Sequence, residues 1–152
     1  MKELFNKLYN KNEESFYKIL AKNLKENKKT FIVTANPETF MMSENDDEMK
    51  KLLLDKNTIL VPDGIGIVKA ARMIDYDIKE RITGIDIANK LLELGNDQKK
   101  SIYLFGAKQE VIDSMKEVLK KNYPDLKLAG TANGYEKDKD KVFEKIAKAQ
   151  PD

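Results

Sequence analysis

A single carboxylate, Asp63, lies where a short apolar run meets a pair of glycines. The run 59–61 is too short for a helix, and Pro62 ends it because proline lacks the N–H that a sheet ladder needs. Gly64 and Gly66 permit a tight turn and a close approach of the backbone to a ligand. In an α/β sheet this is the carboxyl end of a strand, where ligands bind. Asp63 is therefore a candidate to act on a ligand, and the alternative is that it only caps the helix that follows.

Arginine is scarce in this chain, which makes each one a candidate for anion recognition. Of the 28 basic residues only Arg72 and Arg81 are arginines, whose planar guanidinium binds phosphates and carboxylates through two hydrogen bonds. For Arg81 the alternative to a ligand role is a surface ion pair with the preceding Glu80.

The chain has no Cys and no His. Thiol nucleophiles, disulfides, Cys/His zinc sites and His-dependent triads are excluded, so proton transfer must fall to Asp, Glu, Lys or Tyr.

The composition fits one soluble globular domain of 152 residues, with 41% hydrophobic and 36% charged residues. The formal net charge of +2 is too balanced to indicate a nucleic-acid partner. No apolar run reaches membrane-spanning length and no secretory signal opens the sequence, so we expect a cytoplasmic protein.

Two D-x-D triplets, at 75–77 and 138–140, raise the question of a metal. Metal-dependent sugar transferases use such a pair to hold a divalent ion on a nucleotide diphosphate through oxygen ligands. Neither triplet follows an apolar strand, and the second begins a predicted helix, where acidic residues are common. No dinucleotide fingerprint or P-loop is present either. We therefore expect neither a metal site nor a resident cofactor.

Strands and helices alternate along the chain, which predicts the class α/β with a Rossmann-like, mostly parallel sheet and helices on both of its faces. Short apolar runs predict the strands 31–34, 59–61, 102–105 and 126–130. Leu4–Tyr9 is interpreted as a further, rather polar strand.

Capping signals place the ends of several predicted helices. Asn12 begins one over 13–26, and a capping box at Thr83 and Asp86 begins another, with Gly95 as the residue that ends it. In the last predicted helix, four residues are expected to face the core: Val142, Phe143, Ile146 and Ala147.

Polar residues and glycines follow the predicted strands and would gather at one edge of the sheet. Pro37 opens a helix directly after the strand 31–34, beside free helix N–H groups. The residues expected at this edge are Thr34, Asn36, Asp63, Arg81, Gly106 and Gly134. An acid, an arginine, neutral polar groups and glycine turns suit a phosphate-bearing, hydroxyl-rich substrate.

The same residues belong to strings that carry a family resemblance. The strings are Thr34-Ala-Asn-Pro-Glu38, Val61-Pro-Asp-Gly-Ile-Gly66, Glu80-Arg-Ile-Thr-Gly84, Tyr103-Leu-Phe-Gly106, Tyr123-Pro-x-Leu, and Gly130 with Gly134-Tyr135. In this order and spacing, they resemble the WecG/TagA/CpsF glycosyltransferases (family 26) over nearly the whole chain. Within that family the resemblance is strongest to the members that act in wall teichoic acid synthesis.

The resemblance implies a reaction and its substrates. N-acetylmannosamine would pass from UDP-N-acetylmannosamine to C4 of N-acetylglucosamine on undecaprenyl diphosphate, with inversion to a β-1,4 linkage and without a metal. Two alternatives remain open: transfer of a related sugar such as N-acetylmannosaminuronic acid, and a UDP-sugar-binding module without catalysis. A third is that Asp63 only holds its loop.

The resemblance also implies residue roles. Asp63 corresponds to the general base of the family, Thr34 and Asn36 would position substrate, and Arg81 would stabilise charge on the departing diphosphate. Six residues would border the nucleotide: Gly64, Gly66, Gly106, Ala107, Gly134 and Tyr135.

The resemblance implies that residues 1–152 form a single glycosyltransferase domain truncated at its C-terminus. The element pattern agrees with this expectation, since the chain stops where the alternation of strands and helices predicts another strand. Family members continue with that strand, a segment whose glutamine would complete the active site, and a basic tail. That tail would hold the enzyme at the inner face of the cell membrane.

Overall fold

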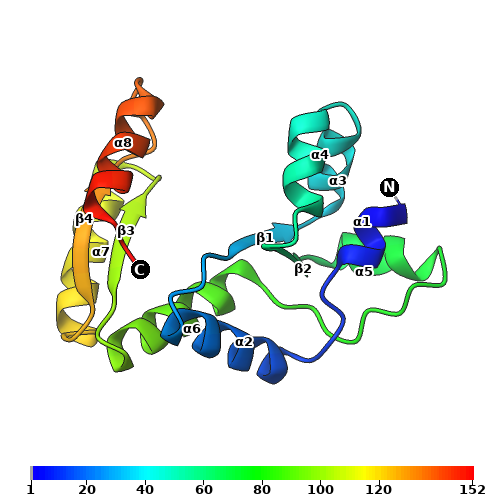
Figure 1. Cartoon of the computed structure of the whole chain (residues 1–152), viewed down its shortest axis with the longest axis horizontal. Helices are drawn as coiled ribbons and strands as arrows, with labels where there is room; N and C mark the ends of the chain where they lie inside the picture. The colour runs from blue at the N-terminus through cyan, green and yellow to red at the C-terminus, as the bar shows by residue number, and fades with distance from the viewer. Residues whose placement is uncertain (1) are drawn as a thin grey trace. The chain divides into compact units, whose positions relative to one another are not determined.

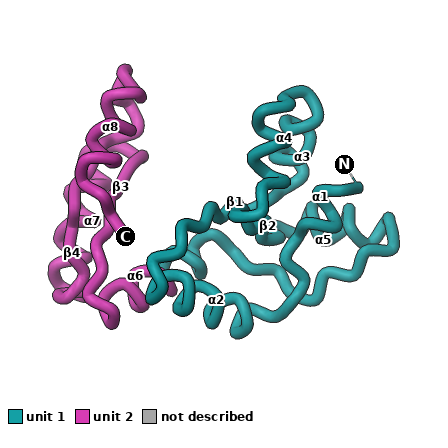
Figure 2. Tube along the Cα trace, in the orientation of Figure 1, with its two compact units in different colours: residues 1–89 teal, residues 90–152 magenta. Residues whose placement is uncertain are grey.

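The computed structural model describes residues 2–152, which divide into two compact units, one ending at Asn89 and one running from Lys90 to Asp152 (Figure 1, Figure 2). The elements of the first unit are α1 (Lys2–Lys7), α2 (Glu13–Lys25), β1 (Phe31–Ala35), α3 (Pro37–Glu44), α4 (Asp47–Leu54), β2 (Thr58–Pro62), α5 (Ile65–Arg72) and the start of α6 (Gly84–Asp97). The second unit holds the rest of α6, β3 (Ser101–Phe105), α7 (Gln109–Asn122), β4 (Lys127–Ala132) and α8 (Lys139–Ala149). The predicted α/β class is confirmed.

The first unit is built on the parallel pair β1 and β2, in register from Phe31 opposite Thr58 to Ala35 opposite Pro62. β2 is the more deeply buried strand. Leu8 makes one parallel bridge to Leu60 of β2. A helix follows each strand closely, as the crossover geometry of parallel strands requires.

The prediction of a strand over Leu4–Tyr9 is wrong, because the segment opens with helix α1. A strand would place alternate residues on the core side, which would bury Leu4 and Leu8 but expose Phe5. As a helix followed by a bridge, the segment buries all three. A helix buries a wider apolar face than a strand of the same residues would, and this favours the helical conformation of the segment.

The core of the first unit is a continuous apolar cluster between the helices and the sheet. The rings of Phe5 and Phe40 meet edge to face with centroids 5.0 Å apart, an arrangement that adds to the free energy of burial. The other members are Leu4, Leu8, Ala35, Leu53, Leu60, Ile67, Val68, Ala71 and Ile78. These contacts hold the elements that carry the loops after β1 and β2.

The second unit pairs β3 with β4 in parallel, with a register shift beside Tyr103. The prediction that Gly95 ends this helix is wrong, because α6 continues to Asp97. A Cβ at Gly95 would lie 2.7 Å from Cδ1 of Leu126, so the glycine makes room for that side chain. In α8, Val142 and Ile146 lie inward as predicted, but Phe143 is 56% exposed and Ala147 is exposed. A sheet of two strands offers too narrow a surface to cover the whole predicted apolar face.

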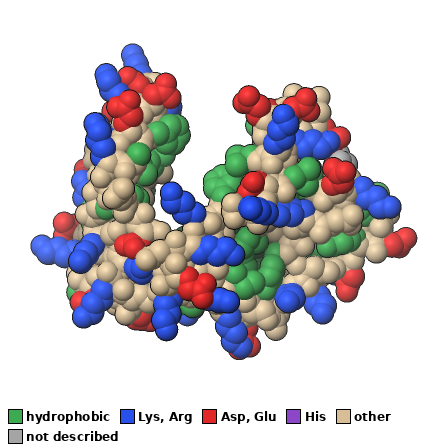
Figure 3. Space-filling view, viewed as in Figure 1, with side chains coloured by type: hydrophobic (Ala, Val, Ile, Leu, Met, Phe, Trp, Pro, Cys, Tyr) green, Lys and Arg blue, Asp and Glu red, His purple; other side chains and the backbone are tan. Residues whose placement is uncertain are grey.

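The surface mixes charges of both signs. On the face shown in Figure 3, Lys and Arg side chains are interspersed with Asp and Glu over both units. Among residues 2–152, no helix is long and apolar enough to cross a bilayer.

Gly130 makes room for a ring on the neighbouring strand. A Cβ at Gly130 would lie 2.5 Å from Cε2 of Tyr103, closer than side chains tolerate. We expect Gly130→Ala to destabilise the fold by about 1–3 kcal/mol, as overpacking does. Denaturant unfolding would measure this loss. In a Tyr103→Leu background, which removes the ring, the added methyl should cost much less. Equal costs in both backgrounds would contradict the steric explanation.

The carboxylate of Asp152 ties the end of the chain to β3. It accepts hydrogen bonds from the Ser101 hydroxyl at 2.8 Å and the Ser101 N–H at 2.9 Å, and pairs with Lys100 at 3.1 Å. The Ser101 bonds, with a smaller contribution from Lys100, lower the pKa of Asp152 from its ordinary value of 3.8.

This lowered pKa predicts a pH dependence. The contact stabilises the folded state fully above pH 3.8, the ordinary value, and its contribution is lost as the pH falls through the lower folded pKa. The Ser101 amide resonance should follow that titration in an NMR series. In Asp152→Ala the titration should vanish, and a persisting Ser101 titration would contradict the assignment.

Candidate functional site

The site is built on the carboxyl ends of β1 and β2. The Asp63 N–H donates to the carbonyl of Ala35 at 3.0 Å, so pairing continues one residue beyond β2. β1 runs into α3, whose N-cap Asn36 accepts the Thr39 N–H at 2.8 Å with its side-chain oxygen. The predicted helix start at Pro37 is confirmed. Asn36 and Asp63 thus follow neighbouring strand ends.

Asp63 does not cap the helix that follows it. The N-cap of α5 is Gly64, at a φ of +84° that disfavours any side chain, and α5 has no side-chain cap. The Asp63 carboxylate instead accepts the N–H of Gly84, the first residue of α6, at 3.2 Å through Oδ2. Its other oxygen, Oδ1, has no hydrogen-bond partner within residues 2–152. Asp63 therefore joins the end of β2 to the start of α6 and keeps one oxygen free.

Gly66 lies in the first turn of α5 rather than before it. A Cβ there would lie 3.0 Å from Cγ of Pro37 in α3. The glycine therefore lets the first turns of the helices after β1 and β2 lie side by side.

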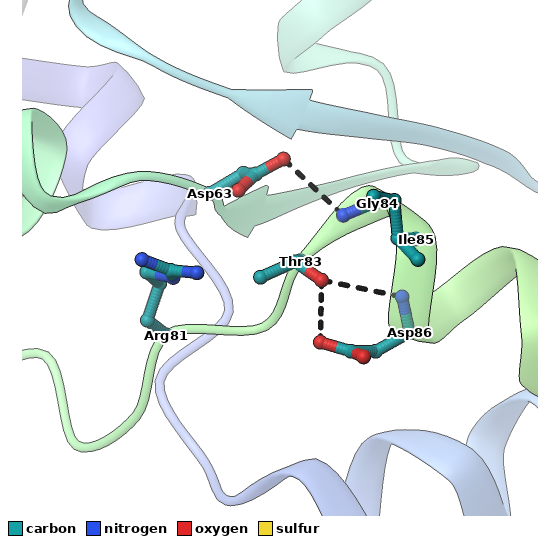
Figure 4. Close-up of a pocket in the computed structure, with 6 residues that line it drawn as sticks. All are labelled: Asp63, Arg81, Thr83, Gly84, Ile85 and Asp86. Carbon is teal, nitrogen blue, oxygen red and sulfur yellow. Dashed lines mark hydrogen bonds between the residues drawn. The ribbon is translucent and has the colours of Figure 1, made fainter.

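The start of α6 carries the predicted capping box. The Asp86 N–H donates to the Thr83 hydroxyl oxygen at 3.2 Å, and that hydroxyl donates to the Asp86 carboxylate (Figure 4). Gly84 lies close to both strand ends, since a Cβ on it would be 3.3 Å from Cγ2 of Thr34 and 3.6 Å from Oδ2 of Asp63. A larger residue at 84 would crowd this junction.

Arg81 is exposed and comes just before this helix start. Ile82, directly after it, is fully buried and donates its N–H to the carbonyl of Pro62 at 3.1 Å. Within residues 2–152 the guanidinium of Arg81 has no ion pair or hydrogen bond. The alternative of an Arg81–Glu80 ion pair is absent, because the Glu80 carboxylate accepts the N–H of Glu13 instead.

These groups surround one open pocket (Figure 4), lined by Asp63, Arg81, Thr83, Gly84, Ile85 and Asp86. Four of these six were not predicted as site residues: Thr83, Gly84, Ile85 and Asp86. The capping box directly after Arg81 was the signal that could have found them. An anionic ligand here would meet a guanidinium and a helix N-terminus, while a hydroxyl would meet a carboxylate oxygen.

The other predicted nucleotide residues gather in the second unit. Gly106, at φ +124°, and Ala107, at φ +55°, form the turn between β3 and α7. The Gly134 N–H donates to the Ala107 carbonyl at 2.8 Å, which joins this turn to the loop after β4. Tyr135, next in that loop, is 71% exposed. Thr34, Asp63 and Arg81 are thus associated in the first unit, and Gly106, Ala107, Gly134 and Tyr135 in the second.

The D-x-D triplets take no part in the pocket. Asp138 is the N-cap of α8 and accepts the Lys141 N–H at 3.1 Å, with Asp140 in the first turn, as predicted for a helix start. Across residues 2–152, no group of three or more Asp, Glu, Cys or His side chains is arranged to hold a metal ion.

This pocket lies at the carboxyl ends of two parallel strands, which is where α/β proteins commonly bind their ligands. The chain belongs to the glycosyl transferase WecG/TagA/CpsF family, whose model matches residues 4–152.

Three curated relatives share the name N-acetylglucosaminyldiphosphoundecaprenol N-acetyl-beta-D-mannosaminyltransferase. The protein of Bacillus subtilis strain 168 is 37% identical over 144 residues, which are 94% of this chain and 56% of that protein. The protein of Bacillus spizizenii is 37% identical over 129 residues, 85% of this chain and 50% of that protein. The Staphylococcus aureus NCTC 8325 protein is 28% identical over 122 residues, 80% of this chain and 48% of that protein. The chain spans about half the length of these curated relatives.

The Asp63–Gly84 hydrogen bond makes a stability prediction. Asp63→Ala removes the acceptor and should cost about 1–2 kcal/mol, which lowers Tm by roughly 2–8 °C for a domain of this size. Asp63→Asn keeps an oxygen that can accept the same N–H and should retain most of the stability. Thermal unfolding of both variants by circular dichroism would measure the difference. If Asn costs as much as Ala, the bond does not hold the junction.

Proposed function

We propose that this protein is an inverting, metal-independent glycosyltransferase of wall teichoic acid synthesis. It transfers N-acetylmannosamine from UDP-N-acetylmannosamine to C4 of N-acetylglucosamine on undecaprenyl diphosphate, and forms a β-1,4 linkage. The observation that carries the proposal is that a carboxylate and a guanidinium line the same pocket without forming an ion pair with each other. Asp63 and Arg81 line it together, and neither neutralises the other through an ion pair.

The two side chains suit the two ends of the reaction. The free Oδ1 of Asp63 takes the proton of the acceptor hydroxyl while the hydroxyl oxygen attacks C1 of the donor sugar. The bond from C1 to the diphosphate oxygen breaks, and UDP leaves with the electron pair. The guanidinium of Arg81 stabilises the negative charge that grows on the departing diphosphate, a charge-assisted interaction that strengthens toward the transition state.

The remaining residues have positioning roles in this proposal. Thr34 lies beside Gly84 and Asp63 and faces the same junction. The side-chain oxygen of Asn36 is committed to the start of α3, so its amide NH₂ is the group left to contact substrate. In the second unit, the Gly106-Ala107 turn with Gly134 and Tyr135 is assigned to the nucleotide. Gly64 and Gly66 permit close approach beside Asp63.

The relatives' shared name supports the acceptor and the sugar. Because the acceptor in that name carries a polyprenol, we place the reaction at the inner face of the cell membrane, with the protein peripheral to it. Transfer of an acidic sugar is the nearest alternative, and it would need a further cation, for which Lys69 and Arg72 of α5 are candidates. A binding module without catalysis is the other alternative.

The deciding experiment follows UDP release from UDP-N-acetylmannosamine with and without the lipid-linked N-acetylglucosamine acceptor. Asp63→Asn should lower kcat by about 10²–10⁴-fold, the usual contribution of a general base, while donor affinity stays within about twofold because the Gly84 contact is kept. Asp77→Asn, a charge-matched change at an exposed aspartate, should leave turnover unchanged.

Other results would redirect the proposal. Donor binding without acceptor-dependent release would favour another sugar or a binding module. Full turnover in Asp63→Asn would show that Asp63 only holds its loop, and the mechanism would have to be abandoned.

A further inference from the structure

The segment that carries Arg81 is anchored on both sides. Ile78 and Ile82 are 4% and 0% exposed, while the three charged residues between them are exposed. No regular helix or strand covers this segment, so its conformation depends on individual contacts. The Ile82 N–H to Pro62 carbonyl bond fixes one end to β2.

The other anchor comes from the start of α2. The Glu80 carboxylate accepts the backbone N–H of Glu13, the first residue of α2, at 2.7 Å through Oε2. Next to it, the Asn10 side-chain oxygen accepts the N–H of Lys79 at 3.0 Å. A carboxylate on a free N–H at a helix N-terminus combines a charge-assisted hydrogen bond with a favourable helix-dipole interaction.

The contact separates the roles of two neighbouring residues. Glu80 is engaged with α2, and Arg81 lines the pocket without a partner. If Glu80 were released, its carboxylate would be free to pair with the adjacent guanidinium, and the segment would gain conformational freedom. Both changes would draw Arg81 away from an anionic ligand.

We infer that Glu80 is a positioning residue that holds the Arg81 segment against the N-terminus of α2 and so keeps the guanidinium directed to the pocket. For its kinetic consequence this inference rests on the proposed function. Because Arg81 acts on charge that develops in the transition state, disorder of its segment lowers kcat more than it changes the KM for the donor.

The test must separate positioning of Arg81 from mere capping of α2. Asn12→Ala is the matched control, since the Asn12 side chain caps the same helix by accepting the Ser15 N–H at 3.0 Å and, within residues 2–152, has no hydrogen bond to the Arg81 segment. Glu80→Gln is the rescue variant, because its amide oxygen can accept the Glu13 N–H without a charge.

In the transfer assay, Glu80→Ala should lower kcat about tenfold, as small misplacements of catalytic groups do. Glu80→Gln should recover most of the loss, and Asn12→Ala should stay within about twofold of the parent chain while losing similar thermal stability. In an Arg81→Ala background, Glu80→Ala should have no further effect on kcat, because the group it positions is gone. The inference is overturned if Asn12→Ala lowers kcat as much as Glu80→Ala, or if the effects of Glu80 and Arg81 multiply.

Amide hydrogen exchange decides the inference without any turnover. In Glu80→Ala the amides of Lys79 and Ile82 should exchange faster than in the parent chain, and in Asn12→Ala they should not. If the parent chain transfers no sugar, the proposed function fails, and the exchange result alone decides whether Glu80 holds this segment. Unchanged exchange in Glu80→Ala overturns the inference.

Discussion

The bond between the Asp63 carboxylate and the first amide of α6 is the contact on which the pocket depends. It joins two segments 21 residues apart in sequence and determines where β2 ends relative to the capping box of Thr83 and Asp86. Gly84 can occupy this junction because it lacks a Cβ that would press on Thr34. One carboxylate thus shapes the site through one oxygen and leaves the other available for chemistry.

Local signals in the sequence predicted much of the fold. Asn12 caps the expected helix, Pro37 opens α3, and the Thr83–Asp86 box begins α6, because each of these signals acts within one helical turn. The failures came where tertiary packing decides. Leu4–Tyr9 is too short to distinguish a helix from a strand by its apolar pattern, and Gly95 lies inside α6 at a position where a side chain would collide with Leu126.

The site was predicted in part for the same reason. The residue types at the turn after β2 made Asp63 a candidate, the scarcity of arginine made Arg81 another, and the structure places both in one pocket. The contacts around them could not be identified from the sequence. Gly84 donates to Asp63, and Glu13 donates to Glu80 beside Arg81, but both are ordinary residues in sequence and become important only through contacts across the fold. The turn residues Gly106 and Gly134 were likewise proposed from their type and position, while the bond from Gly134 to Ala107 depends on how β3 and β4 pair.

The anchoring of Glu80 on α2 has a consequence for how the protein is made. Glu13 and Glu80 are 67 residues apart in sequence. Glu13 therefore leaves the ribosome long before Glu80, which accepts its N–H, has been synthesised. The parallel bridge of Leu8 likewise cannot form before Leu60 has been synthesised. The N-terminal segment therefore cannot complete these two contacts during synthesis until β2 and the segment after α5 have emerged.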